Sequence, residues 1–255
     1  MTRHSPQDLG LRPWPSLRAD RPLVLVPVGS VEQHGPHLPL ATDAIVAAAV
    51  AREAARVLAA RGAQVVVAPT AAYGASGEHE GFPGTMSIGH EALHAVLVEL
   101  GRSACRWAAG VVFVNGHGGN VPTLKKAVEL LRYEGRAVAW TSCDLPGADA
   151  HAGRTETSLL LKLTPDVVVV DDIVAGCTTP VTELMPRLRA EGVAAVAPNG
   201  VLGDPRGSTA EEGARLFAQL VDLLVAELTT LEVVGAGRLS SVTADAAVAR
   251  SVAAP

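Results

Sequence analysis

Residue types that bind metal ions or transfer protons gather in three short segments, and the first contains Glu32, His34 and Asp43. This segment, residues 29–43, reads GSVEQHGPHLPLATD and directly follows an apolar run. Glu32 and His34 are separated by one residue, so in an extended backbone both side chains project to the same side and can reach one cation. Asp43 can reach the same place from the start of the next helix, or it can merely cap that helix.

The second segment, residues 115–120, reads NGHGGN and lies between an apolar run and a predicted helix. Its glycines allow backbone and substrate to approach a bound ion closely. We therefore expect His117 to bind metal and Asn115 and Gly118 to contact the substrate, together with His37 of the first segment. A glycine-rich turn before a helix can also hold phosphate, but neither GxxxxGK[ST] nor a complete GxGxxG is present.

The third segment, residues 151–158, reads HAGRTETS. His151 and Glu156 are five residues apart, so they converge only if a turn at Gly153 precedes a helix that starts near Thr155. Taken alone, Glu156 is better explained as an acidic residue that complements the dipole of that helix. A metal-binding role for Glu156 is indicated only when the segment is considered together with the other two.

Together these carboxylates and imidazoles are ligands that suit Zn²⁺, Mn²⁺ or Fe²⁺ rather than copper(I) or an iron-sulfur cluster. Several carboxylates in one site indicate two divalent ions per subunit. Two ions bridged by a carboxylate can hold a hydroxide and polarise an amide carbonyl, which is the chemistry of a hydrolase.

The elements that must position these segments alternate between strands and helices. Apolar, β-branched runs predict a mostly parallel sheet, and alanine- and leucine-rich segments predict helices on both of its faces, which is an α/β fold. Ligands of such sheets bind beyond the carboxyl ends of the strands. The predicted strands are 22–28, 64–68, 111–114, 137–141 and 167–170, and the predicted helices are 43–61, 90–109, 122–133, 156–163 and 210–228.

Composition limits the remaining possibilities. The chain has 255 residues, 48% hydrophobic and 18% charged residues, and a net charge of −5 with scattered basic residues, which argues against a nucleic-acid partner. No signal-peptide core or membrane-length apolar run is present, so we expect a cytoplasmic, soluble protein with no membrane partner. We expect one domain over residues 1–232 and a mobile tail over 233–255. The long, glycine-rich segment 73–89 is a candidate functional loop.

With these segments in view, the chain resembles the creatininase family over roughly residues 20–230. The segments SGEHEGFPGT (76–85) and PNGVLGDP (198–205) add to the match, and in detail they resemble the mycofactocin-system branch of that family. The resemblance implies a three-layer αβα sandwich that assembles into homo-oligomers such as hexamers. It implies metal binding by Glu32, His34, Asp43 and His117, with Asp43 bridging two ions.

The resemblance also implies a reaction. Enzymes of the mycofactocin branch are peptidases that remove a Val-Tyr dipeptide from the C-terminus of a modified precursor peptide, so such a peptide is the expected substrate. His151 matches a family histidine implicated in catalysis, and we expect it to protonate the leaving amine. Arg154 is close in sequence and can bind the free C-terminal carboxylate, although it can equally be an exposed residue at the helix start.

One position departs from the family pattern. Creatininase itself has a ligand glutamate two residues after the histidine that matches His117, and here that position is Gly119. This difference favours the peptidase over creatinine hydrolysis, and we expect Glu156 to replace the missing carboxylate, with Glu78 and Glu80 as rivals. The alternatives are a creatininase-like or deformylase-like hydrolase of a small cyclic amide or formamide, and a metal-stabilised binding protein without activity.

Overall fold

The computed structural model describes residues 6–18 and 21–240. Within these residues the strands form a six-stranded sheet in the order β2-β1-β3-β4-β6-β5. All neighbouring pairs are parallel except β5 and β6, which form an antiparallel pair at one edge. The strands are β1 (Leu23–Val28), β2 (Val65–Val67), β3 (Gly110–Asn115), β4 (Val138–Ser142), β5 (Val233–Val234) and β6 (Arg238–Leu239).

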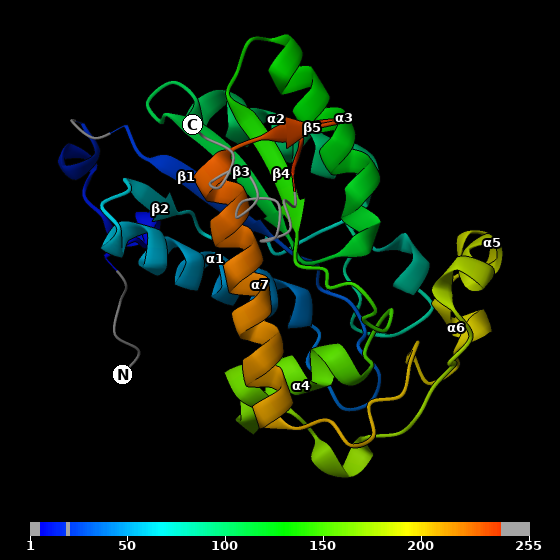
Figure 1. Ribbon diagram of the computed structural model, residues 1–255. Helices are drawn as coiled ribbons and strands as arrows, with labels where there is room; N and C mark the ends of the chain where they lie inside the picture. Colours follow the sequence, from blue (N-terminus) through cyan, green and yellow to red (C-terminus); the bar gives the residue numbers. More distant parts are fainter. Residues whose placement is uncertain (1–5, 19–20, 241–255) are drawn as a thin grey trace, which may run out of the picture.

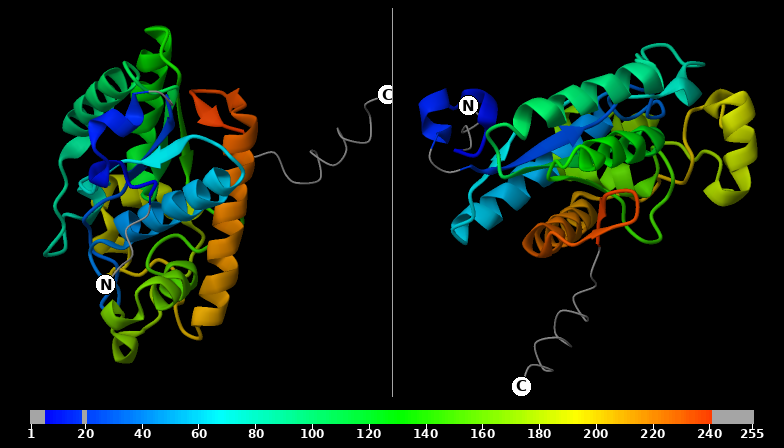
Figure 2. Two further views of the ribbon diagram at one scale, coloured as in Figure 1. Left: turned by 90° about the vertical axis from the view of Figure 1, so that its left-hand side faces the viewer. Right: turned by 90° about the horizontal axis from the view of Figure 1, so that it is seen from above.

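Helices cover both faces of the sheet. Helices α1, α4 and α7 lie on one face and α2 and α3 on the other, while α5 and α6 stand at the side of the molecule (Figures 1 and 2). This arrangement is a three-layer αβα sandwich, as predicted. The helices are α1 (Thr42–Ala60), α2 (Gly89–Ala104), α3 (Val121–Tyr133), α4 (Arg154–Leu163), α5 (Val181–Glu191), α6 (Val193–Val196) and α7 (Ala210–Thr230).

The two cores follow from the period of two along each strand. Leu25 and Val112 face the cluster formed with α1, α4 and α7, whereas Val24, Val111 and Phe113 face the cluster formed with α2 and α3. All five side chains are almost fully buried. Strands that are apolar on both faces are typical of a parallel sheet between two helical layers, and such a sheet is a rigid support for the loops at its ends.

The first turn of helix α1 leaves the carboxylate of Asp43 available for the site. The helix begins at Thr42, whose hydroxyl donates to the carbonyl of Pro39 at 2.7 Å, and no side chain caps the first turn. The carboxylate of Asp43 is therefore not used as a cap, and it points into the site described below.

Two expectations about the fold are corrected. Residues 167–170 form no strand, because Val167, Val169 and Val170 are exposed and the chain runs through two short 3₁₀ turns. Instead, part of the expected tail, β5 and β6, completes the sheet beside β4. The rest of that tail, residues 241–255, lies outside the described residues. None of the described helices combines the length and the apolar content needed to cross a membrane.

A buried carboxyl group links α7 to the sheet. Glu227 of α7 accepts a hydrogen bond of 2.6 Å from the hydroxyl of Thr141 on β4. Burial raises the pKa of Glu227, with the hydrogen bond and Arg238 opposing this. A carboxyl group with a raised pKa in the folded state stabilises the fold at pH values below its ordinary pKa, and this contribution is lost as the pH rises through the folded-state pKa.

We predict that Glu227→Gln is more stable than the wild type at neutral pH, because glutamine keeps an acceptor for Thr141 without a buried charge. The difference should disappear as the pH falls below the ordinary pKa of glutamate. Denaturant unfolding over a pH series measures this, with the exposed Glu232→Gln as the control. An advantage of Glu227→Gln that does not change with pH would contradict the prediction.

Candidate metal centre

The site lies at the carboxyl edge of the sheet, where four parallel strands end side by side. Val28, the last residue of β1, pairs with Asn115 of β3, which in turn pairs with Ser142 of β4, so these strand ends are level. The segments that follow β1, β2, β3 and β4 each contribute polar side chains to one buried cluster. Its members are Glu32, His34, Asp43, His79, His117, His151 and Glu156.

Two acidic residues of the cluster are buried with carboxylate oxygens that lack hydrogen-bond partners. Glu32 is 0% exposed and neither of its carboxylate oxygens has a hydrogen-bond partner among the described residues. The same is true of Oδ2 of Asp43, which is 3% exposed. A buried carboxylate without compensation is strongly unfavourable, so these oxygens require a nearby positive charge.

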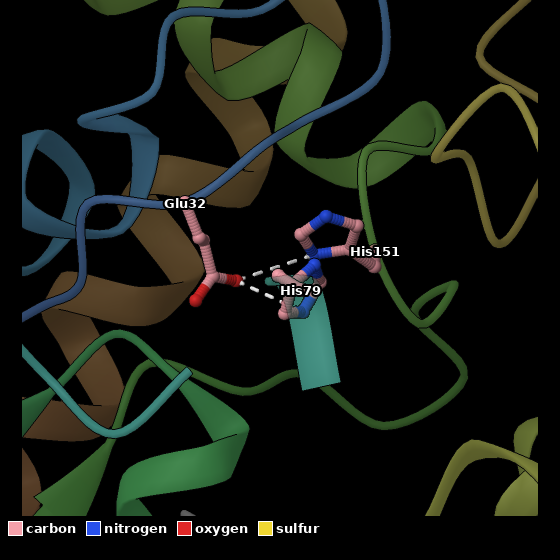
Figure 3. A group of neighbouring side chains, drawn as sticks. All are labelled: Glu32, His79 and His151. Carbon is pink, nitrogen blue, oxygen red and sulfur yellow. Dashed lines mark ion pairs between the residues drawn. The ribbon is translucent and has the colours of Figure 1, made fainter. Parts of the chain in front are cut away.

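Three imidazoles surround one oxygen of Glu32. Oε1 lies 3.2 Å from Nδ1 of His117, 3.3 Å from Nε2 of His79 and 3.7 Å from Nδ1 of His151. Figure 3 shows the side chains of His79 and His151 converging on Glu32 from separate segments. Nitrogen and oxygen donors that converge in this way from different loops are the donor set of a transition-metal site.

Asp43 connects two groups of possible ligands. Its Oδ1 lies 3.1 Å from Nε2 of His34, and its Oδ2 lies 3.4 Å from Nδ1 of His117. Glu32, Asp43 and His117 form one group whose ligand atoms all lie within 4.8 Å of one another. His34, His151 and Glu156 form another such group, so a carboxylate stands between two candidate ion positions.

Charge in the cluster also favours cations. Burial alone would raise the pKa of Glu32, but the imidazoles of His117 and His79 hold it well below its ordinary value. Burial disfavours protonated His34, yet Asp43 and Glu156 raise the pKa of His34 to about 10.

His117 behaves in the same way. Against its burial, Glu32 and Asp43 raise the pKa of His117 to about 9. In the absence of an ion, the carboxylates thus hold protons on the imidazoles beside them. Divalent ions provide the same positive charge while binding both ligand types, so the residues present fit a metal centre.

A hydrogen-bond network orients the two histidines that do not contact Asp43. The side-chain amide of Gln33 lies 2.9 Å from Nδ1 of His79 and donates to the carbonyl of Gly200 at 3.1 Å. Nε2 of His151 lies 2.8 Å from the carbonyl oxygen of Gln33. The side-chain amide nitrogen of Gln33 lies 3.0 Å from the same Nε2. The carbonyl is closer and can only accept, which favours a proton on Nε2 of His151 and a lone pair on Nδ1 that faces the cluster.

The carboxylate of Asp149 shapes the loop that presents His151. It accepts hydrogen bonds from the backbone N–H groups of Arg154 and Thr155, which start helix α4. Between these residues, Ala152 has a positive φ of 50°, and its N–H donates to the carboxylate of Glu156 at 2.6 Å. The predicted turn before α4 therefore exists, and it brings His151 and Glu156 together.

The cluster opens into a cavity of about 990 Å³. Asp43, His117, His151 and Glu156 line its inner side, and residues of α5 and α6 line its outer side. Gly118 also borders it, and a side chain added at Gly118 would meet open space.

Three residues expected to contact the substrate are not among those that line the cavity. His37 is fully buried and its Nε2 is hydrogen bonded to Thr157 at 2.8 Å. Asn115 is buried and donates to the carbonyl of His117, so it holds the turn that carries the histidine. The guanidinium of Arg154 pairs with Glu212 of α7 at 2.8 Å, which already satisfies its charge.

The expected replacement of the missing carboxylate at Gly119 by Glu156 stays a prediction, and the structure shows which carboxylates lie nearby. Oε2 of Glu156 lies 3.9 Å from His34, on the other side of the cluster. The space beside Gly119 instead holds Glu78, whose Oε1 is 3.5 Å from Nε2 of His117. This nitrogen faces away from Glu32, so Glu78 acts on the outer side of the imidazole.

His79 is the member of the cluster that the sequence interpretation did not identify. It belongs to the glycine-rich loop after β2, within a 3₁₀ turn at Gly77–His79. The sequence predicts a functional loop here, with the flanking Glu78 and Glu80 as its candidate ligands. The EHE sequence at 78–80 was the available signal.

Comparison with known proteins agrees with this fold and site. The sequence matches the creatininase family, described as creatinine amidohydrolase, over residues 12–228. The chain belongs to the creatininase family of hydrolases. A mycofactocin precursor peptide peptidase from Mycolicibacterium smegmatis is 58% identical over 218 residues, which are 85% of this chain and 88% of that protein.

Other relatives define the range of similarity. A protein of the same description from Mycobacterium ulcerans is 53% identical, with 87% of this chain and 90% of that protein covered. A creatinine amidohydrolase from Pseudomonas putida is 30% identical over 60% of this chain and 68% of that protein. The chain is thus more similar to these peptidases than to this creatinine amidohydrolase.

Solved structures show the same architecture. The creatininase Mn form has a TM-score of 0.74 and 25% identity, covering 88% of this chain and 98% of its own. A mutant creatininase of Zn-Zn type has a TM-score of 0.73 and 25% identity, and the match covers 89% of this chain and 98% of the mutant creatininase.

Gly119 allows a test of the geometry around His117. A Cβ at Gly119 would lie 2.4 Å from Nε2 of His117 and 2.6 Å from the carbonyl oxygen of Ala75. Since the backbone carbonyl cannot easily move, the imidazole of His117 must shift to make room for the added methyl group. We predict that Gly119→Ala lowers metal affinity on the order of 10–100-fold, as loss of a ligand-orienting contact does.

Gly118→Ala is the matched control, because the added methyl group at the neighbouring position meets no atom. Metal content after dialysis against graded chelator concentrations, measured by mass spectrometry, compares the two variants. Equal metal retention by both would show that His117 is not held as described.

Proposed function

We propose that this chain is a metal-dependent peptidase that releases the C-terminal Val-Tyr dipeptide from the modified mycofactocin precursor peptide. The observation that carries the proposal is a pair of buried carboxylates beneath an open cavity: both oxygens of Glu32 and one oxygen of Asp43 have no hydrogen-bond partner among the described residues. Relatives at 52–58% identity described as mycofactocin precursor peptide peptidases support the substrate.

The two groups around Asp43 would hold two divalent ions, for which Zn²⁺, Fe²⁺ and Mn²⁺ are suitable. Glu32, Asp43 and His117 would bind one. His34 would bind the other, together with Asp43 and Glu156, which lie 3.1 and 3.9 Å from its Nε2. When bound, such ions polarise an amide carbonyl and lower the pKa of water.

His151 is suited to proton transfer. Its Nε2 proton is held by the carbonyl of Gln33, which fixes the ring and leaves the lone pair of Nδ1 facing the cluster. Nδ1 can accept a proton from the attacking water and pass it to the leaving nitrogen. This transfer completes the cleavage of the amide bond.

The size of the cavity favours a peptide. Pockets for small molecules usually have volumes of about 300–1,000 Å³. The cavity here, about 990 Å³, lies at the upper end of that range and has room for more than one amino-acid residue. A small cyclic amide or formamide would leave most of it empty. Homo-oligomerisation is part of the proposal, and the exposed Val167, Val169 and Val170 offer an apolar surface for it.

The reaction can be tested with a synthetic precursor that carries the modified C-terminal pair. With divalent metal present, mass spectrometry should detect intact Val-Tyr and the shortened peptide, while creatinine and formamides react poorly. Release of single amino acids, or efficient opening of creatinine, would refute the proposal.

We predict that His151→Ala reduces kcat by roughly 10²–10⁴-fold, the usual contribution of general acid-base catalysis, while both ions remain bound. Steady-state kinetics and metal analysis of the same preparation check this. Loss of an ion from the variant would instead make His151 a ligand, a role that its position beside His34 and Glu156 also permits.

We further predict that Glu156→Gln keeps the first ion and weakens the second, since Glu156 approaches the cluster only on the side of His34. Titration of metal into the stripped protein should give one tight site and one weakened site. Glu80→Gln, on the loop after β2 but outside the cluster, is the control. Two sites of wild-type affinity in Glu156→Gln would assign the carboxylate to the helix start alone.

A further inference from the structure

The outer wall of the cavity is built by helices that take no part in the metal centre. Helices α5 and α6 stand apart from the three layers (Figure 1) and are held by a small apolar cluster of their own. In this cluster Leu184 and Val193 pack with Leu202 and with Phe82 of the loop after β2. The wall is therefore anchored to the same loop that carries His79.

One face of α5 is turned to the cavity. Val181, Met185, Leu188 and Arg189 line it, and their spacing places them on one stripe of the helix. Three apolar side chains thus stand beside one guanidinium. Such a surface can receive an apolar or aromatic side chain together with a negative charge.

Arg189 is the only arginine or lysine among the described residues that line the cavity. Apart from histidines, the other charged side chains there are acidic, so away from the metal centre a carboxylate would be repelled unless a cation met it. These acidic residues are Asp43, Glu78, Glu80, Asp144, Asp149, Glu156 and Glu191.

Arg189 also differs from the arginines around it. Arg187 of the same helix pairs with Glu191 at 3.2 Å, Arg154 pairs with Glu212, and Arg206 pairs with Asp204 at 2.7 Å. Arg189 has no hydrogen-bond or ion-pair partner among the described residues, and it is exposed at the cavity. Its fork of N–H donors is free for a planar anion, and a carboxylate has the matching geometry.

We infer that Arg189 binds the free C-terminal carboxylate of the substrate, and that Val181, Met185 and Leu188 receive the last side chain. The inference rests on the proposed peptidase function and adds the means by which the enzyme measures two residues from the chain end. A guanidinium on the outer wall facing a metal centre on the inner wall sets the length of the released fragment.

The test compares the precursor peptide with a free C-terminal acid against the same peptide with a C-terminal amide. For the wild type, the KM of the acid should be lower than the KM of the amide by on the order of 10–100-fold, as expected for a charge-assisted bidentate contact. Arg189→Gln should lose this preference through the KM of the acid, with kcat and metal content little changed. Arg189→Lys should recover it in part, because lysine keeps the charge without the fork.

Arg187→Gln is the matched control on the same helix, and it should retain the wild-type preference for the acid. Calorimetry with Val-Tyr and its amide gives the same comparison without turnover. Equal preference for the acid in the wild type and Arg189→Gln, in a protein that does release Val-Tyr, would overturn this inference alone. A wild type that releases no dipeptide would overturn the proposed function and the inference with it.

Discussion

The structure depends on the burial of two carboxylates whose oxygens are only partly satisfied by hydrogen bonds. Glu32 and Asp43 lie in the interior at the end of an apolar sheet, where an uncompensated negative charge is highly unfavourable. The surrounding histidines meet this demand with protons, and divalent ions would meet it with greater charge. The cluster is consequently built around cations, and the loops that carry it are fixed by the strands beneath them.

The sheet and the outer helices have different roles in the site. The strands bring ligands from distant parts of the sequence to one edge, where α1 and the turn before α4 complete the set. Helices α5 and α6 contribute no ligand, but they enclose the space in front of it (Figure 1). Proteins described as creatinine amidohydrolase and as mycofactocin precursor peptide peptidase are both relatives of this chain.

The sequence alone identifies those candidate metal ligands that lie close together in the chain or in a distinctive turn. Glu32 and His34 share one extended segment, and His117 lies in a glycine-rich turn that serves no core. His79 was missed because its partners follow other strands, and the flanking Glu78 and Glu80 are the one local signal that distinguishes it from a surface histidine. Arg189 was equally hidden, since its importance lies in the absence of a neighbouring acid, which no local pattern encodes.

The errors in the fold have a related cause. The valines at 167–170 have strong strand propensity, yet they pair with no strand of the sheet. Only Val168 is buried, and the other three are exposed in or between two 3₁₀ turns. The short strands β5 and β6 have weak local signals and exist because β4 offers an edge. In both cases tertiary pairing decides the conformation.

The central claim is that the buried cluster binds two ions with Asp43 between them. Anomalous diffraction from crystals grown with Zn²⁺ tests it directly. The account predicts two peaks on either side of the Asp43 carboxylate, one beside Glu32 and His117 and the other beside His34 and Glu156. A single peak away from Asp43, or none in the cluster, would contradict it.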